Sequence, residues 1–544
     1  MKDYTSHVDT FARDRLPPRE QWPEFVFDRP ELDYPGRLNC ATRLVDDVVA
    51  DGHGARIALR SPNETLTYAE LLERANRIAH VLTHDMRVAP GNRVLLRAPN
   101  NPMLVAAWLA VMKVGAIAVT TMPLLRAKEL AVIAGLGQVE HALCDARLAG
   151  ELEAAARDTG RLRTVLHFGN GELERRMAAH SPRFTNCATA ATDVCVLAFT
   201  SGTTGKPKAT MHFHRDVLAM ADVVARHLLF TTPDDIYVGS PPIGFTFGLG
   251  ALLVFPLAFR ASVALVEQPT PDALLEAVQR YRATCLFTAP TMYANLRGLV
   301  GRYDLSSLER CVSAGEPLSK AISDAWFNAT GIRIIDGIGA TEMMHIFIGA
   351  HGDAIRPGAT GKPLPGYQAC VLDEQHRPLP PGNTGWLAVK GPTGCRYLDD
   401  PRQRDYVING WNITGDRYLV DEDGYFWFQA RADDMIISAG YNIAGPEVES
   451  TLLAHASVKE CAVVGSPDET RGQIVKAFVV IRETHAAGPE LVRELQEFVK
   501  ASIAPYKYPR AIEFVDTLPK TPTGKVQRFV LRQQEREKSD SGPG

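Results

Sequence analysis

Apolar and polar positions follow two different periods along the first part of the chain. Three short apolar runs predict buried strands: IALRS at 57–61, RVLLRAP at 93–99 and AIAVTT at 116–121. The longer segments 66–83 and 103–114 between them predict helices, and Thr67 offers a helix cap with Glu70 three residues later. Because strands alternate with helices, we expect parallel sheets covered by helices.

The alternation of strands and helices resumes at VCVLAFTSG (194–202), and the pattern of predicted elements then changes twice. Short strands with proline and glycine turns follow Ile355, and a mixed unit of about 110 residues, the size of a small domain, follows Arg431. We predict an α/β protein: a large N-terminal domain (1–432) of two parallel-type α/β subdomains plus a small β-rich subdomain, and a small mobile α+β C-terminal domain (433–544). The last ten residues should fray.

One uncharged segment, residues 237–259, is long enough to cross a bilayer. Prolines and glycines interrupt its first half, which leaves roughly 12 residues, the length of a buried core helix. The N-terminus is polar from its second residue and lacks the apolar core of a secretory signal. We therefore expect no membrane segment and a cytoplasmic location.

Composition and charge exclude several other classes. The 544 residues are 45% hydrophobic and 22% charged, and the net charge of −4 comes from acidic and basic residues mixed along the chain, so no nucleic-acid partner is expected. The nine cysteines form no Cys-x-x-Cys pair, which argues against a disulfide framework or a thiolate zinc site and favours a reducing compartment.

The stretch TSGTTGKPKAT at 200–210 has the residue types of a phosphate-binding loop, because glycines let backbone N–H groups approach an anion and hydroxyls add donors. Its spacing is not that of a Walker loop: Gly202 and Gly205 are three apart, and Pro207 follows Lys206 where a magnesium-binding hydroxyl would stand. Taken alone, these residues could also form a polar surface turn.

Six further blocks follow that loop: SAGEPL at 313, DGIGATE at 336, GATGKPLPG at 358, TGD at 414, ARADDMIISAGYNIAGPEVE at 430 and PKTPTGKVQR at 519. Together the seven blocks, in this order, resemble the adenylate-forming enzymes, which include acyl- and aryl-CoA synthetases, luciferases and the adenylation domains of peptide synthetases. The resemblance spans nearly the whole chain. It implies that a carboxylic acid attacks the α-phosphate of ATP, and that coenzyme A then displaces AMP from the acyl adenylate.

The resemblance also implies roles for individual residues. Thr341 would contact the α-phosphate, Glu342 would help to hold Mg²⁺, and Lys525 would supply the main catalytic charge. The loop would hold the β- and γ-phosphates through Thr200, Ser201, Gly202, Thr203, Thr204, Gly205 and Lys206.

The nucleotide's ribose and base have their own expected contacts. Asp416 would accept hydrogen bonds from the ribose hydroxyls with help from Arg431, and Asp336 would meet the amino group of adenine. Gly315, Glu316 and Pro317 match the backbone that passes along the base. Ile338 departs from the pattern, because many members have an aromatic residue there.

Asp433 falls at the expected hinge of a rotating C-terminal domain, and Gly440 would leave room for the pantetheine arm.

The acid is expected to be aromatic, because phenylalanine faces suit a flat ring. Phe245, Thr246, Phe247, Gly339 and His345 resemble the acyl pocket of benzoate-CoA ligases, and the run at 8–39 resembles the entry segment of 2-aminobenzoate-CoA ligases. We rank 2-aminobenzoate first, benzoate second and a medium-chain fatty acid third. A stand-alone adenylation enzyme that loads a carrier protein is the alternative class, and a monomer or a homodimer is expected.

Overall fold

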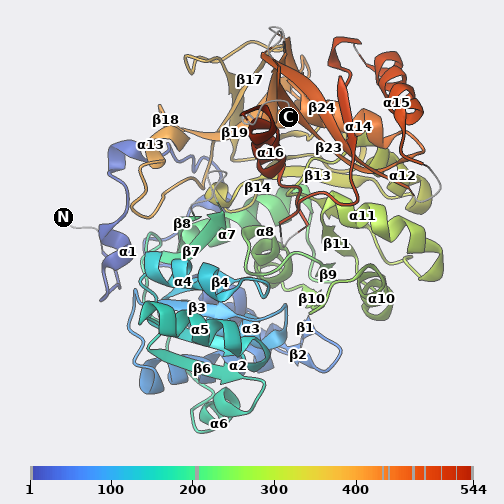
Figure 1. Cartoon of the computed structure of the whole chain (residues 1–544). Helices are drawn as coiled ribbons and strands as arrows, with labels where there is room; N and C mark the ends of the chain where they lie inside the picture. Colours follow the sequence, from blue (N-terminus) through green and yellow to red (C-terminus); the bar gives the residue numbers. More distant parts are fainter. Residues whose placement is uncertain are drawn as a thin grey trace.

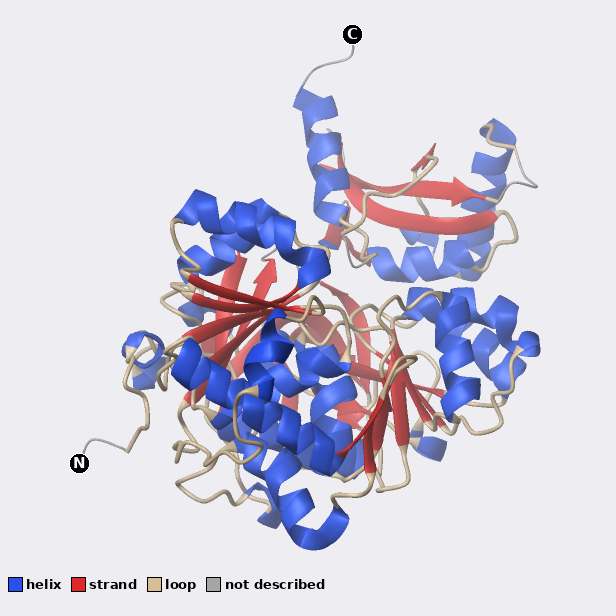
Figure 2. Ribbon diagram, turned by 90° about the horizontal axis from the view of Figure 1, so that it is seen from below, coloured by secondary structure: helices blue, strands red, loops and turns tan. Residues whose placement is uncertain are grey.

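Two mainly parallel sheets form the centre of the N-terminal part, with helices between and around them (Figure 1, Figure 2). The structure is a computed structural model that describes residues 4–201, 207–431, 434–438, 441–468, 472–482, 486–503, 505–521 and 524–540. Within these residues no helix is both long and apolar enough to cross a membrane. The segment 237–259 instead contributes short helical pieces to the core, as its prolines and glycines indicate.

The first sheet has six strands in the order β6-β5-β3-β4-β7-β8, parallel except for β8. Every residue of β3 and β5 is buried, as expected for strands that helices cover on both faces. The strands are β3 (Arg93–Arg97), β4 (Ile117–Thr121), β5 (His141–Asp145), β6 (Thr164–Phe168), β7 (Val194–Ser201) and β8 (Pro207–Phe213).

The second sheet has nine strands in the order β15-β14-β13-β12-β11-β9-β10-β1-β2. Its central strands run parallel, and antiparallel strands close both edges. The strands are β1 (Ile57–Arg60), β2 (Thr65–Thr67), β9 (Ile236–Gly239), β10 (Ser262–Ala264), β11 (Cys285–Thr288), β12 (Arg310–Ser313), β13 (Ile334–Gly339), β14 (Ile346–Gly349) and β15 (Lys362–Pro363).

The helices of this part begin with the signals that the sequence offers. Thr67 caps α2, and Thr67 and Glu70 form the predicted reciprocal capping box. The helices are α1 (Phe11–Asp14), α2 (Tyr68–His80), α3 (Pro102–Lys113), α4 (Ala127–Leu136), α5 (Ala149–Thr159), α6 (Glu172–Ala178), α7 (His214–Met220), α8 (Thr246–Leu249), α9 (Phe255–Ala258), α10 (Pro271–Tyr281), α11 (Pro290–Leu296) and α12 (Lys320–Thr330).

A smaller antiparallel sheet follows at the position where the sequence changes texture. Its strand order is β16-β17-β19-β18. Strand β18 pairs with the start of β19, and β20 pairs with residues 416–420 at the end of β19. Its elements are β16 (Gln368–Leu372), β17 (Thr384–Lys390), α13 (Gln403–Tyr406), β18 (Val407–Ile408), β19 (Trp411–Val420) and β20 (Phe426–Arg431).

The C-terminal part, orange to red in Figure 1, is an α+β unit with its own apolar core. Its helix α14 packs against α12 and β20 of the N-terminal part. The boundary at 432/433 lies outside the described residues and stays a prediction. The elements are β21 (Met435–Ser438), β22 (Tyr441–Ala444), α14 (Gly445–Leu453), β23 (Val458–Asp468), β24 (Gly472–Ile481), α15 (Pro489–Ser502), β25 (Ala511–Phe514) and α16 (Arg528–Asp540).

The prediction of ten frayed final residues is wrong for the first six, because α16 continues to Asp540. Glu535 is buried within this helix, where its carboxylate accepts hydrogen bonds from Ser466 Oγ at 2.7 Å and Lys476 Nζ at 2.8 Å. These partners lie on two strands, so local composition could not reveal the contact that holds the helix end.

Candidate active site

A buried carboxylate lies at the centre of the candidate site. Glu342 is 7% exposed; it accepts a hydrogen bond from the Tyr397 hydroxyl at 2.5 Å, and Lys208 Nζ lies 2.8 Å from its Oε1. The ammonium of Lys208 also donates to the Tyr397 hydroxyl and lies 4.4 Å from the centre of that ring. Burial alone would raise the pKa of Glu342, but the charge and hydrogen bond of Lys208 lower it below its ordinary value. Glu342 is therefore ionised at neutral pH.

Strand β8 brings this group together. Lys208 lies near the start of β8, and the segment after β17 pairs with the same strand through Met211 N to Arg396 O at 2.8 Å and Leu398 N to Ala209 O at 2.9 Å. Arg396 is also ion-paired with Asp216, and neither side chain is exposed. Because the backbone is held on both sides of Tyr397, its hydroxyl has a fixed position beside Glu342.

Thr341 and Thr200 are the predicted phosphate-binding residues that the structure connects to this carboxylate. Thr341 precedes Glu342 and opens a short 3₁₀ turn, Thr341–Met343. Thr200 is paired in register with Lys208, and its hydroxyl is buried with no hydrogen-bond partner among the described residues. Ser201 ends β7, opposite Pro207. Gly202, Thr203, Thr204, Gly205 and Lys206 lie outside the described residues.

The predicted ribose and adenine residues come from three strands. Asp416 and Arg431 are partners in the β19–β20 ladder, with Arg431 Nη1 3.4 Å from Asp416 Oδ1. Asp336 on β13 is aligned with Ser313 at the end of β12, whose hydroxyl is buried without a described partner. An unpaired hydroxyl and a carboxyl group on neighbouring strands suit a polar ligand.

The turn after β12 carries the other predicted adenine contacts. Gly315 has φ +90°, a backbone conformation that favours glycine. Glu316 accepts a hydrogen bond from Thr291 Oγ1 at 2.8 Å, and Pro317 is exposed. This turn follows β12 directly, so its backbone lies beside the end of that strand.

Lys525 reaches the same place from the C-terminal part. Thr521 N donates to Lys525 O at 2.7 Å and Lys525 N donates to Thr521 Oγ1 at 3.1 Å, which closes a tight turn. Surrounding protein lowers the pKa of the Lys525 ammonium, the positive charge of Arg431 lowers it further, and the carboxylates of Asp416 and Glu316 oppose this shift. The charges of these predicted nucleotide residues therefore act on the ammonium of Lys525, whose side chain is exposed.

The predicted acyl residues form an aromatic cluster around a buried histidine. His345 is 3% exposed, its ring lies 5.6 Å from that of Phe247 and 4.6 Å from that of Phe255, and its Nε2 is 3.2 Å from Phe247 O. A Cβ on Gly250 would lie 2.4 Å from His345 Cδ2, and one on Gly339 would lie 2.8 Å from the His345 backbone, so both glycines permit this packing.

Two further predicted residues flank this cluster. Phe245 is the N-cap of α8, and Thr246, 8% exposed, is the first residue of that helix.

Burial lowers the pKa of His345 to about 3, so its ring is neutral at physiological pH. Since a carbonyl oxygen can only accept, Nε2 carries the proton and Nδ1 carries a lone pair. That Nδ1 is buried and has no hydrogen-bond partner among the described residues.

Two family models cover most of the chain. The model described as "AMP-binding enzyme" matches residues 47–396, and "AMP-binding enzyme C-terminal domain" matches residues 447–525. The chain belongs to the AMP-binding enzyme family. This confirms the resemblance drawn from the seven blocks.

Several relatives that match this chain over nearly its full length are named CoA ligases. The benzoate–CoA ligase of Thauera aromatica is 34% identical over 92% of this chain and 97% of its own length. The solved structure of the anthranilate CoA ligase AuaEII in complex with anthranoyl-AMP has a TM-score of 0.90 at 32% identity, covering 94% of this chain and 100% of that one. A benzoate CoA ligase from Burkholderia xenovorans LB400 has a TM-score of 0.83 at 31% identity, covering 91% and 100%. The predicted fold class is confirmed.

Lys208 and Tyr397 were missed as candidate site residues in this AMP-binding enzyme. Lys208 stands in the quoted loop block, but the sequence did not separate its role from that of Lys206. Tyr397 lies in GCRYLDD, which carries no signal of its own. Only the pairing of its segment with β8 places its hydroxyl on Glu342.

Asp336 yields a prediction for the ligand-free enzyme. Burial raises the pKa of Asp336 to about 8, above its ordinary value of 3.8. Between these values the unfolded chain releases the proton and the folded chain keeps it, so the wild type loses stability as the pH rises. Asparagine cannot ionise, so Asp336→Asn should be more stable by about 1–3 kcal/mol at pH 8. Urea unfolding at pH 4, 6 and 8 should show the advantage vanish at pH 4, and a pH-independent difference would contradict it.

Proposed function

We propose that this enzyme is an ATP-dependent aryl-CoA synthetase. The carboxylate of the acid attacks the α-phosphorus of ATP and pyrophosphate leaves; the thiol of coenzyme A then attacks the acyl carbon and AMP leaves, so that a thioester forms. The convergence of Lys525, Asp416, Arg431 and Glu316 at the contact of the two parts supports this function. The full-length similarity to CoA ligases supports the same reaction.

In the first step the enzyme must hold two anions together. Asp416 accepts hydrogen bonds from the ribose hydroxyls, Arg431 supports it, and Thr341 donates to the α-phosphate. The Lys525 ammonium stabilises charge that builds on the phosphoryl oxygens. Glu342 would hold Mg²⁺: its carboxylate is ionised, and oxygen ligands suit this ion, which would neutralise triphosphate charge.

The second step requires a thiol to reach the acyl adenylate. We assign Gly440 to the passage of the pantetheine arm and Asp433 to the hinge about which the C-terminal domain turns. Both residues lie outside the described part of the chain, so these roles rest on the sequence blocks.

With all nine cysteines unpaired, we also place the enzyme in the reducing cytosol, as a monomer or homodimer.

We propose 2-aminobenzoate as the preferred acid, and His345 Nδ1 is the observation that carries this choice. The aromatic rings around His345 suit a flat acid, and its buried lone pair needs a donor. An ortho amino group supplies that donor, whereas benzoate does not. An unpaired buried polar group costs about 1–3 kcal/mol, which corresponds to roughly 10- to 100-fold in rate.

The ortho preference can be measured with a matched pair of acids. 2-Aminobenzoate and 2-methylbenzoate have nearly the same shape, but only 2-aminobenzoate has an N–H donor at the ortho position. Its kcat/KM should therefore exceed that of 2-methylbenzoate by roughly 10- to 100-fold. In His345→Phe, which keeps a ring but has no lone pair, the ratio should fall to near one. An unchanged ratio in this variant would show that the amino group does not meet Nδ1.

The alternative acids and the alternative acceptor need one assay. AMP release with benzoate, 2-aminobenzoate, salicylate and hexanoate, with and without coenzyme A, separates benzoate-CoA ligase and medium-chain synthetase activity from the proposed one. If pyrophosphate forms with an aromatic acid but coenzyme A never accelerates AMP release, the enzyme loads a carrier protein instead. Release of AMP with hexanoate alone would remove the aryl assignment.

A further inference from the structure

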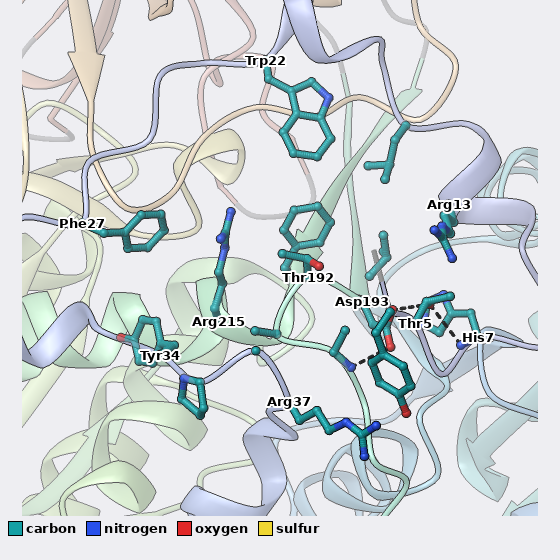
Figure 3. Close-up of a pocket in the computed structure, with 18 of the residues that line it drawn as sticks. Thr5, His7, Arg13, Trp22, Phe27, Tyr34, Arg37, Thr192, Asp193 and Arg215 are labelled. Carbon is teal, nitrogen blue, oxygen red and sulfur yellow. Dashed lines mark hydrogen bonds between the residues drawn. The ribbon is translucent and has the colours of Figure 1, made fainter. Parts of the chain in front are cut away.

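The N-terminal run of the chain forms one wall of a cavity that the proposed reaction does not use. Figure 3 shows this cavity between residues 4–37 and the ends of β7 and β8. Its volume is about 670 Å³, within the range of sites that hold drug-sized ligands. The cavity volume is several times that of a benzoate ring, so the cavity has room for a nucleotide.

Positive charge dominates the lining. Arg13, Arg19, Arg37 and Arg215 all line the cavity, against the carboxylates of Asp33 and Asp193. Asp193 is already saturated: it accepts hydrogen bonds from Thr5 Oγ1, from Ser6 N at 2.9 Å and Oγ at 2.8 Å, and from Ala190 N at 2.9 Å. Four guanidinium groups against two carboxylates on the lining favour an anion, and the planar guanidinium matches phosphate geometry.

Two buried polar groups on the lining lack hydrogen-bond partners among the residues that the structure describes. His7 is 7% exposed, and neither of its ring nitrogens has a hydrogen-bond partner among the described residues. The Nε of Arg215 is likewise buried without a hydrogen-bond partner in the part of the chain that the structure describes, and the carboxylate of Asp216 lies 3.9 Å from it. Buried donors are normally satisfied, and each unsatisfied one costs free energy, so two on one cavity indicate a ligand rich in acceptors.

Aromatic rings supply the apolar surface of the same cavity. Trp22, Phe27, Tyr34 and Phe213 line it, and the Arg215 guanidinium lies 4.7 Å from the centre of the Phe27 ring. Figure 3 shows Arg215 between Trp22 and Phe27. Tryptophan and phenylalanine faces stack on planar rings, so the lining offers both parts of a site for a charged aromatic molecule.

This cavity is separate from the candidate active site. Thr192–Val194 and Phe213–Arg215 lie at one end of the β7–β8 hairpin, and the phosphate-binding loop joins its other end. Seven residue steps along β7 separate Val194 from Ser201, which is roughly 24 Å at about 3.4 Å per residue. One hairpin therefore connects the cavity to the loop.

We propose that the cavity under the N-terminal segment is a second ligand site for a phosphorylated nucleoside. The phosphate pairs with Arg215 and Arg37, the base stacks beside Trp22 and Phe27, and His7 donates to the ligand. This site goes beyond the proposed reaction and does not depend on it.

Calorimetry with AMP as the probe tests the site. The full-length enzyme is first saturated with a non-hydrolysable aryl-adenylate analogue, so that the active site is filled, and AMP is then titrated. We expect one further site, with a tenfold or greater loss of affinity in both Arg215→Gln and Arg37→Gln. Arg280→Gln, an arginine on α10 outside the cavity, is the matched control and should bind AMP as the wild type does.

Fluorescence and a second arginine variant distinguish AMP binding in this cavity from binding elsewhere. Trp22→Phe should abolish the part of the tryptophan fluorescence change that accompanies the second binding event. If Arg215→Gln unfolds, Arg37→Gln still decides, because Arg37 lies at the exposed rim beside Tyr4. Absence of AMP binding to the analogue-saturated enzyme, or equal weakening in Arg280→Gln, overturns the second site.

Discussion

Lys525→Ala is expected to slow adenylate formation about a thousandfold while thiolation of a supplied aryl adenylate continues at nearly the wild-type rate. A charge 4 Å from a phosphoryl oxygen at an effective dielectric of 20 contributes about 4 kcal/mol, which corresponds to that factor. Thr521 closes the turn that carries Lys525, and the charges of Asp416, Arg431 and Glu316 act on its ammonium. Single-turnover pyrophosphate release and thioester formation from the isolated adenylate measure the two steps separately.

The control for this prediction is Lys520→Ala, five residues earlier on the same part. Lys520 pairs with Glu460 of the C-terminal part at 2.5 Å, so its loss should leave both steps unchanged. Lys525→Arg keeps the charge but changes its shape, and an intermediate rate is expected. Equal losses in both half-reactions of Lys525→Ala would contradict a role confined to adenylation.

Lys208→Met is expected to destabilise the folded enzyme by about 3 kcal/mol, because it leaves the buried carboxylate of Glu342 without its cation. In the wild type the lowered pKa of Glu342 adds stability above its ordinary pKa, which is lost as the pH falls. In the variant, burial raises that pKa instead. The deficit should therefore be largest at neutral pH and shrink towards pH 4, as urea unfolding can show.

A double variant makes this prediction specific. Lys208→Met with Glu342→Gln removes the charge along with its partner and should recover most of the lost stability. The matched control is Lys320→Met, whose exposed pairing with Asp324 on α12 should contribute less than about 0.5 kcal/mol. If the double variant is no more stable than Lys208→Met alone, the ion pair is not the cause.

Much of the fold followed from the chain because the signals were local. Apolar runs separated by helical periods predicted the parallel sheets, and Thr67 with Glu70 predicted the start of α2. Helix α16 could not be predicted this way, since Glu535 is held by Ser466 and Lys476 from distant strands. Similarly, Cys40, Cys195 and His214 meet in the core, with Cys40 Sγ 3.2 Å from His214 Nδ1, although no spacing links them.

The sequence alone determined the family, the reaction class and most of the candidate residues, because the blocks assigned to phosphate and ribose are short, contiguous and in a fixed order. Only the tertiary structure showed that Tyr397 and Lys208 enclose Glu342, that His345 keeps an unpaired nitrogen among aromatic rings, and that the N-terminal segment encloses a basic cavity. These features depend on burial and on contacts between residues far apart in the chain. Hydrogen-bond partners and desolvation are properties of the packed molecule, so a linear pattern does not contain them.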